Sequence, residues 1–276
     1  VRIGVTTPMG PAMAIAQRES NGTFTSRIEP LQNEILGIIQ LGRTADAGLI
    51  ISDHAVFDER TGETHVLDLN GSQPARFDAA LSDEGWVLSW SSSNPAELHL
   101  LHENGQQFSS PLSGSSACTV GDPIAFDREK DGVPEFLIAC GSQLFGFHSN
   151  GTLMDDYPFQ AFGQVLSDLI VVESPELNQQ MALFQTSEGS LDGVELEGDV
   201  RRSEGFPLSS GHASSIAPTV IVSPETQGLG LSPIFLALSN QGALSGWIAA
   251  DDRSIVSRPR SSFDLAVDVR GRSTPG

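Results

Sequence analysis

One short segment of the chain carries carboxylates at alternate positions, a spacing that suits metal binding. Asp127, Glu129 and Asp131 are followed by Gly132, which permits a sharp turn. Calcium takes about six to eight oxygen ligands, often from such loops and including a backbone carbonyl. The expected ligands are Asp127, Glu129, Asp131, Glu135 and the carbonyl of Val133. We expect a structural calcium ion here, with a solvated acidic turn as the alternative.

Apart from this acidic segment, the sequence shows no recognised catalytic or metal-binding pattern. The segment is not an EF-hand, because Ile138 stands where that motif requires its final Glu. His99 and His102 lie three apart on an expected strand, so they point to opposite faces and cannot share a metal. Nucleophile-elbow, phosphate-binding-loop and zinc spacings do not occur. We therefore expect no catalytic residues and no cofactor besides calcium, which favours a non-catalytic protein.

The two cysteines are placed so that they could pair across a hairpin. If Ala117–Phe126 and Glu135–Cys140 are its strands and the loop centres near Glu129, Cys118 and Cys140 face each other. A disulfide between them is expected, and it would indicate an extracellular or periplasmic protein. Two reduced cysteines packed in the core are the alternative.

Short strands closed by glycine turns recur along the whole chain. The turn glycines are Gly22, Gly71, Gly105, Gly151 and Gly198, at steps of 34 to 49 residues, with Asp251 and Asp252 in the corresponding place of a sixth copy. A period in this range with several strands per unit is typical of a β-propeller. The chain is therefore expected to be all-β, with residues 1–276 forming a single propeller domain.

Each unit divides into four expected strands. In the fourth unit these are Ala117–Phe126, Glu135–Cys140, Leu144–His148 and Thr152–Pro158. In the fifth they are Ser167–Val172, Gln180–Thr186, Leu191–Leu196 and Val200–Leu208, and the sixth begins with Ala217–Ser223, Ile234–Leu238 and Leu244–Ala249. The first unit supplies only three, at Arg2–Thr6, Ala12–Gln17 and Thr23–Glu29, while the C-terminal part has a spare strand at Phe263–Val269. The spare strand would complete the first blade from inside and leave no open edge. This closure predicts six four-stranded blades, and a seven-bladed or incomplete ring stays open as an alternative.

One part of the sequence resembles a known family. Asp127–Gly141, an acidic loop followed by a short apolar strand and glycine, looks like the repeats of FG-GAP/VCBS-type propellers, and Leu144–Gly151 is similar to their third strand. The resemblance implies an extracellular or periplasmic protein that binds proteins or glycans, with structural calcium in some members. Enzymes on similar scaffolds include polysaccharide lyases and quinoprotein dehydrogenases, and fold alone does not choose among them.

The charge of the chain is strongly negative. It has 35 acidic and 15 basic residues, a formal charge of −20, and Lys130 as its single lysine. Such a chain repels phosphate backbones and anionic lipids, which argues against nucleic-acid partners. No apolar stretch approaches the roughly 20 residues of a membrane-spanning helix, so no membrane insertion is expected. The absence of a signal-peptide core at Val1 suggests a mature or trimmed chain.

These observations favour an extracytoplasmic, non-catalytic propeller that binds a protein or cell-surface partner. The acidic charge serves solubility, or it attracts cations or a basic partner. One alternative is a carbohydrate-active enzyme or glycan-binding module that uses the central channel. Another is a scaffold subunit of an envelope assembly, for which the weakly charged segment 219–237 would be a contact surface.

Closure of the ring generates a test. Deleting the residues after Ser261 removes the expected closing strand and exposes a sheet edge. We expect the truncated protein to aggregate or to lose cooperative thermal unfolding in calorimetry. A cooperative melt unchanged from that of the full chain would contradict the closure.

Overall fold

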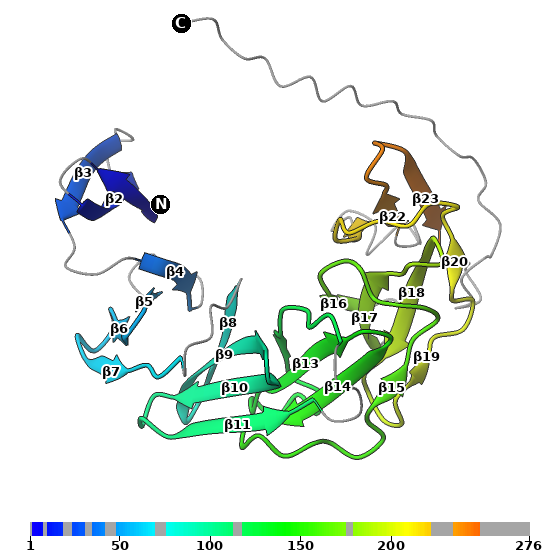
Figure 1. Ribbon diagram of the computed structural model, residues 1–276, viewed down its shortest axis with the longest axis horizontal. Coiled ribbons are helices and arrows are strands. Elements are labelled where there is room, and N and C mark those ends of the chain that lie inside the picture. The colour runs from blue at the N-terminus through cyan, green and yellow to red at the C-terminus, as the bar shows by residue number, and fades with distance from the viewer. Residues whose placement is uncertain are drawn as a thin grey trace, which may run out of the picture.

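The chain folds into six antiparallel sheets that follow one another in sequence (Figure 1). The computed structural model describes residues 2–7, 10–18, 24–30, 35–41, 48–69, 76–112, 118–174, 179–221 and 234–248. Within these ranges the regular structure consists of strands, and no helix is long and apolar enough to cross a membrane. The all-β class expected from the sequence is therefore confirmed.

Each sheet is made of consecutive strands. The first contains β1 (Arg2–Thr7), β2 (Gly10–Arg18) and β3 (Phe24–Pro30). The second contains β4 (Ile35–Gln40), β5 (Gly48–Ser52), β6 (Ala55–Asp58) and β7 (Thr64–Val66). The third contains β8 (Phe77–Ser82), β9 (Gly85–Ser93), β10 (Ala96–His102) and β11 (Gln107–Pro111). The fourth contains β12 (Ile124–Phe126), β13 (Glu135–Cys140), β14 (Gln143–His148) and β15 (Phe159–Gln160). The fifth contains β16 (Ile170–Ser174), β17 (Gln179–Gln185), β18 (Ser190–Glu195), β19 (Arg201–Arg202) and β20 (Leu208–Ser209). The last contains β21 (Thr219–Ile221), β22 (Ile234–Leu238) and β23 (Leu244–Ile248).

The described sheets form an arc around a common axis. The first strands of neighbouring sheets lie against each other, β4 beside β8, β8 beside β12 and β12 beside β16. In Figure 1 the sheet of β1–β3 lies at one end of the arc and that of β22 and β23 at the other. The predicted closing strand Phe263–Val269 lies outside the described residues, so the number of blades in a closed ring stays a prediction.

Strands β9, β13 and β17, in the middle of the third, fourth and fifth sheets, bury apolar side chains on both faces, because another sheet covers each side. All six residues of β13 are buried. Phe136 and Ile138 pack against the third sheet, whereas Leu137 and Ala139, one position along, pack against the fifth. Successive side chains of a strand point to opposite faces, so a sheet between two neighbours needs apolar residues at both sets of positions.

Four apolar clusters join the sheets pairwise, and each draws its side chains from two successive sheets. The second and third sheets share a cluster that includes Ile51, Val56, Trp86 and Trp90. The third and fourth share Leu98, Leu100, Phe136, Ile138, Phe145 and Phe147. The fourth and fifth share Leu137, Leu144, Ala182, Phe184 and Val194. The fifth and last share Leu183, Leu191, Phe206, Phe235 and Trp247. The hydrophobic core is therefore distributed between the sheets.

A glycine in the third strand of two successive sheets receives an aromatic ring. A Cβ atom on Gly146 would lie 2.5 Å from the Tyr157 ring, and one on Gly193 would lie 2.7 Å from the Phe206 ring. Tyr157 and Phe206 each precede a proline. The two glycines are thus required by close packing, with no unusual backbone angle recorded for either.

This packing explains where the predicted outer strands were wrong. Thr152–Pro158 was expected as the outer strand of the fourth unit, but β15 comprises only Phe159 and Gln160. The expected outer strand at 200–208 of the fifth unit is likewise replaced by β19 and β20. The residues before each proline turn inward to place the aromatic ring, and proline has no N–H for a sheet ladder. The second strands β13 and β22, by contrast, have the expected bounds, whereas the innermost strand expected at Ala117–Phe126 is only Ile124–Phe126, β12.

The disulfide between Cys118 and Cys140 is present, with the two Cα atoms 5.3 Å apart. The predicted hairpin register was wrong, however, because Phe126 pairs with Glu135 and Val120 forms a bridge with Cys140. The turn is shifted toward its C-terminal side, where Gly132 has a φ of 83°. The disulfide therefore joins Cys140 to a residue just beyond its ladder partner.

The glycine–aromatic contacts predict a stability effect. We expect Gly193→Ala to lower the free energy of unfolding by about 1–3 kcal/mol, because the added methyl group overlaps the Phe206 ring. Gly121→Ala is the control, since its Cβ would lie 3.4 Å from the nearest atom. Urea denaturation compares the two variants, and equal losses would contradict this account.

Candidate functional site

The predicted calcium loop joins β12 to β13, and its carboxylates accept hydrogen bonds from the loop itself. Asp127 accepts from the N–H of Asp131 through one oxygen (3.1 Å) and from that of Gly132 through the other (2.9 Å). Asp131 accepts from the N–H of Val133 at 2.8 Å. These contacts hold the turn that brings β12 and β13 into register.

Glu135 is buried at the start of β13 and accepts a hydrogen bond from the N–H of Arg128 at 2.8 Å. Burial raises the pKa of its carboxyl, and the negative charges of Asp127, Asp131 and Glu129 add to this shift. Glu135 is therefore drawn into the blade, and its oxygen supports the same turn.

In this conformation the loop's carboxylates are engaged by its own backbone. Both oxygens of Asp127 and one of Asp131 already serve backbone N–H groups. Within the described part of the chain, no group of three or more His, Cys, Asp or Glu side chains is arranged to hold a metal. Calcium at Asp127, Glu129, Asp131, Val133 and Glu135 stays a prediction.

The loop lies at one end of the arc, and several other turns at this end also carry acidic residues. Antiparallel strands alternate in direction, so the turns after first strands and after third strands lie at the same end. Carboxylates on these turns and beside them are Asp58, Glu59, Glu63, Asp83, Glu84, Glu103, Asp127, Glu129, Asp131, Glu173, Glu197 and Asp199. We call this set the acidic end.

The basic residues on the same turns make contacts between neighbouring sheets. Arg60 lies 2.6 Å from Glu103 of the third sheet and 2.9 Å from Asp58. Arg128 donates to the carbonyl of Gly198 in the fifth sheet. Lys130 lies 2.8 Å from Glu197 and 3.5 Å from Glu173. These positive charges are thus engaged locally, and the end as a whole keeps an excess of carboxylates.

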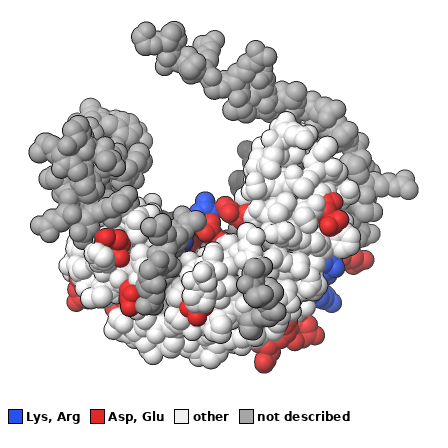
Figure 2. Space-filling view, viewed as in Figure 1, with Lys and Arg blue, Asp and Glu red and all other residues white. Residues whose placement is uncertain are grey.

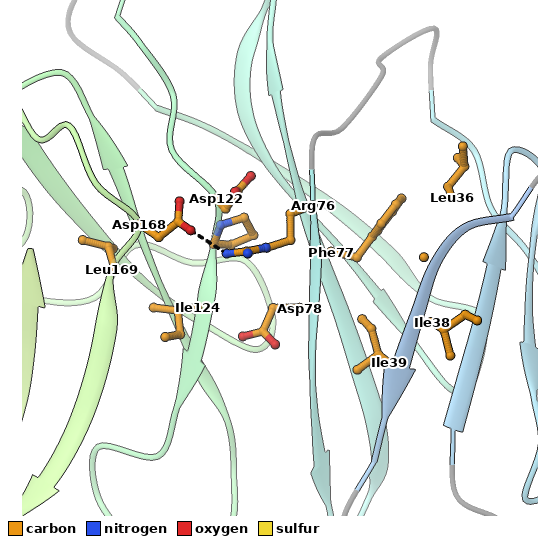
Figure 3. A pocket seen from close by; sticks show the side chains of 12 residues that line it. Leu36, Ile38, Ile39, Arg76, Phe77, Asp78, Asp122, Ile124, Asp168 and Leu169 are labelled. Carbon is orange, nitrogen blue, oxygen red and sulfur yellow. Dashed lines mark hydrogen bonds and ion pairs between the residues drawn. The ribbon is translucent and has the colours of Figure 1, made fainter. Parts of the chain in front are cut away.

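The first strands enclose a cavity of about 440 Å³ on the axis of the arc (Figure 3). It lies where these strands begin, whereas the acidic end lies where they finish. Its apolar lining consists of Leu36, Ile38, Ile39, Phe77, Pro123, Ile124 and Leu169. Its charged lining consists of Arg76, Asp78, Asp122 and Asp168. Figure 2 also shows positive and negative atoms side by side at the concave edge of the arc.

An ion pair crosses the mouth of this axial cavity. Arg76 Nη1 lies 2.8 Å from Asp168 Oδ2, and both side chains remain partly exposed. Arg76 directly precedes β8 and Asp168 comes shortly before β16, so the pair connects the third sheet with the fifth. Exposure limits its contribution to stability to about 1 kcal/mol or less.

Asp78 has a structural role in the same wall. Its carboxylate accepts from the N–H of Ala125 at 2.7 Å and from that of Ala79 at 2.9 Å. The first contact fixes β8 against β12. Burial raises the pKa of the Asp78 carboxyl, although the two backbone hydrogen bonds and the charge of Arg76 oppose that shift.

Asp122 differs from Asp78 because its carboxylate is not tied down. It is half-buried, and none of the hydrogen bonds among the described residues ends on its side chain. Burial raises the pKa of Asp122, the neighbouring charge of Asp168 adds to the rise, and Arg76 opposes it. The cavity is thus lined by three carboxylates, of which Asp78 serves backbone N–H groups and Asp168 pairs with the single guanidinium, that of Arg76.

Sequence reasoning missed this cavity, although a signal was present. Arg76, Asp122 and Asp168 each stand one or two residues before a first strand, in three successive units. Aligning the units on their first strands would have placed these charges in one ring around the axis. The repeat had been recognised from its glycine turns, of which those at Gly105, Gly151 and Gly198 lie at the opposite end.

His99 has a structural environment. It is buried, and its two ring nitrogens lie 2.8 Å from Ser109 Oγ and 2.9 Å from Ser92 Oγ. Its ring stacks on Trp90, and burial lowers its pKa despite the nearby Glu97. This histidine stabilises the third sheet.

The acidic loop generates a test that separates the two accounts of its carboxylates. We expect Asp127→Ala to lower the free energy of unfolding by about 0.5–1.5 kcal/mol, because two exposed N–H groups lose this acceptor and bind water instead. Chemical denaturation with and without calcium should give the same loss, and Glu84→Gln, in the exposed β8–β9 turn, is the control. A wild-type melting temperature that rises with calcium, and no longer does so in Asp127→Ala, would instead establish the calcium site.

Comparisons with known proteins bear on the fold. No family model and no curated protein sequence matches the chain. A solved structure of BBS1N in complex with ARL6DN aligns with a TM-score of 0.53 and 11% identity, covering 92% of this chain and 79% of that one. Dihydro-heme d1 dehydrogenase NirN in complex with DHE aligns with a TM-score of 0.60 and 13% identity. That alignment covers 92% of this chain and 53% of NirN, so the chain spans about half of NirN's length. Identities this low show the fold alone, and with the six sheets described above they show a β-propeller fold.

Proposed function

We propose that the protein is a non-catalytic propeller of the FG-GAP/VCBS type that binds a basic protein or cell-surface partner at its acidic end. The observation that carries the proposal is the excess of carboxylates on turns of four successive sheets. Propellers present their turns at the ends of the ring, so these carboxylates form one continuous rim. The solved BBS1N structure, a complex with ARL6DN, supports the use of this fold for protein binding.

Electrostatics explains why such a rim suits recognition. Its basic residues are already paired within the protein, as with Lys130 and Glu197, so unpaired carboxylates such as Glu84 and Asp199 dominate the field. A concentrated negative field accelerates encounter with a basic surface and discriminates against acidic ones. A glycan partner would draw less benefit from this field.

The disulfide bears on location. Disulfides persist in oxidising compartments and are rare in the cytosol, so Cys118–Cys140 points to a non-cytoplasmic protein. We propose an extracellular or periplasmic location, in agreement with the acidic, soluble surface.

Neutralising the acidic end tests the proposal. The acidic-end variant carries Glu84→Gln, Glu129→Gln and Asp199→Asn. Wild type and variant are each used as bait in the extracellular fraction of the source. The masses of the bound partners are then measured by native mass spectrometry. The control carries Asp53→Asn, Asp68→Asn and Glu188→Gln, which remove the same charge at the opposite end. We expect wild type and control to hold the same basic partner, and the acidic-end variant to lose it. Retention of that partner by the acidic-end variant would overturn the proposal.

A second candidate function has one observation in its favour. A lyase needs a charge neutraliser near a base, and the axial cavity brings Arg76 together with Asp122 and Asp168. The surrounding carboxylates repel acidic sugars, so neutral glycans would be the better substrates. Release of reducing ends from a panel of glycans by wild type, and its loss in Asp122→Ala, would replace the non-catalytic proposal with this enzymatic one.

A further inference from the structure

We propose that the axial cavity binds an aliphatic ammonium or guanidinium group, carried by a small organic cation or by a side chain of a partner. This site lies where the first strands begin and is independent of the acidic end, so the proposed function does not depend on it.

One carboxylate of the cavity wall, that of Asp122, has no recorded partner and could bind a positively charged group. Arg76 is paired with Asp168 at 2.8 Å, and Asp78 is held by the N–H groups of Ala79 and Ala125. Asp122 is half-buried beside that ion pair, with no hydrogen bond recorded from any other described residue. Partial burial disfavours the charged form of this carboxylate, and a cation with N–H donors in the cavity would favour it.

The apolar residues of the cavity wall indicate that the ligand has a hydrocarbon portion. Leu36, Phe77, Ile124 and Leu169 line the same cavity, and Figure 3 shows them around the charged residues. A cavity of about 440 Å³ falls in the range of small-ligand sites. Its mixture of aliphatic surface and charge therefore matches a short alkyl chain that ends in a cationic head.

A metal ion fits the cavity less well than an organic cation. Divalent metals require several oxygen ligands and compete poorly where a guanidinium already neutralises one carboxylate. No metal-holding group of three or more side chains exists among the described residues, and the charge of Arg76, paired with Asp168, would repel a metal ion at Asp122. An ammonium or guanidinium needs only one or two acceptors, which Asp122 supplies.

Calorimetric titration tests the site with defined probes. Butylguanidine and butylamine represent free cations, a lysine-containing tripeptide represents a partner's side chain, and butyrate and butanol are the matched anionic and neutral controls. We expect the cationic probes to bind and the two controls to give no heat. Binding by the tripeptide without the free cations would assign the site to a partner, and binding by the free cations alone would assign it to a small molecule.

Two variants connect the binding to Asp122. Asp122→Asn removes the charge at nearly constant shape, and we expect about 10- to 100-fold weaker binding. Asp168→Asn should also weaken binding, because it frees Arg76 to neutralise Asp122. Glu188→Gln, outside the cavity, should bind as wild type does, and melting temperatures establish that each variant is folded. Absence of binding by every cationic probe, or unchanged affinity in both variants, would overturn the proposal.

Discussion

The fold depends on one constraint, the burial of both faces of every middle sheet by its neighbours. Among the sheets whose burial the structure describes, each apolar cluster takes its side chains from two successive sheets. In β13 the side chains alternate between two such clusters over a single strand. Removing one sheet would therefore expose apolar surface on two others, which is the physical reason for a continuous array.

The same constraint produces the two surfaces with functional interest. Sheets stacked face to face around an axis bring their first strands together, so residues that precede those strands converge from distant parts of the sequence. Arg76 and Asp168 meet in this way. The turns at the other end are free of packing demands, and there the chain accumulates carboxylates. Recognition at the rim and binding on the axis are thus separate consequences of one architecture.

The sequence predicted the class of fold, second strands such as β13 and β22, and the cysteine pair, because these follow from local patterns. Glycine turns recur visibly, and β13 contains the unbroken apolar run Phe136–Cys140. It did not predict the outer strands, because Tyr157 and Phe206 fold inward onto Gly146 and Gly193 through contacts between strands. The hairpin register failed for a related reason, since the position of a turn within an acidic loop depends on which carboxylate accepts from which N–H. The axial cavity could not be predicted from local sequence patterns, because its charged residues come from three different units.

Hydrogen exchange measured by mass spectrometry tests the central claim, that each middle sheet is stabilised from both sides. Peptides covering β9, β13 and β17 should exchange most slowly and at similar rates, because each strand lies between two clusters. Peptides covering the short outer strands β15 and β19 should exchange faster. If β9, β13 and β17 exchanged as fast as β15 and β19, the shared cores could not be what holds this protein together.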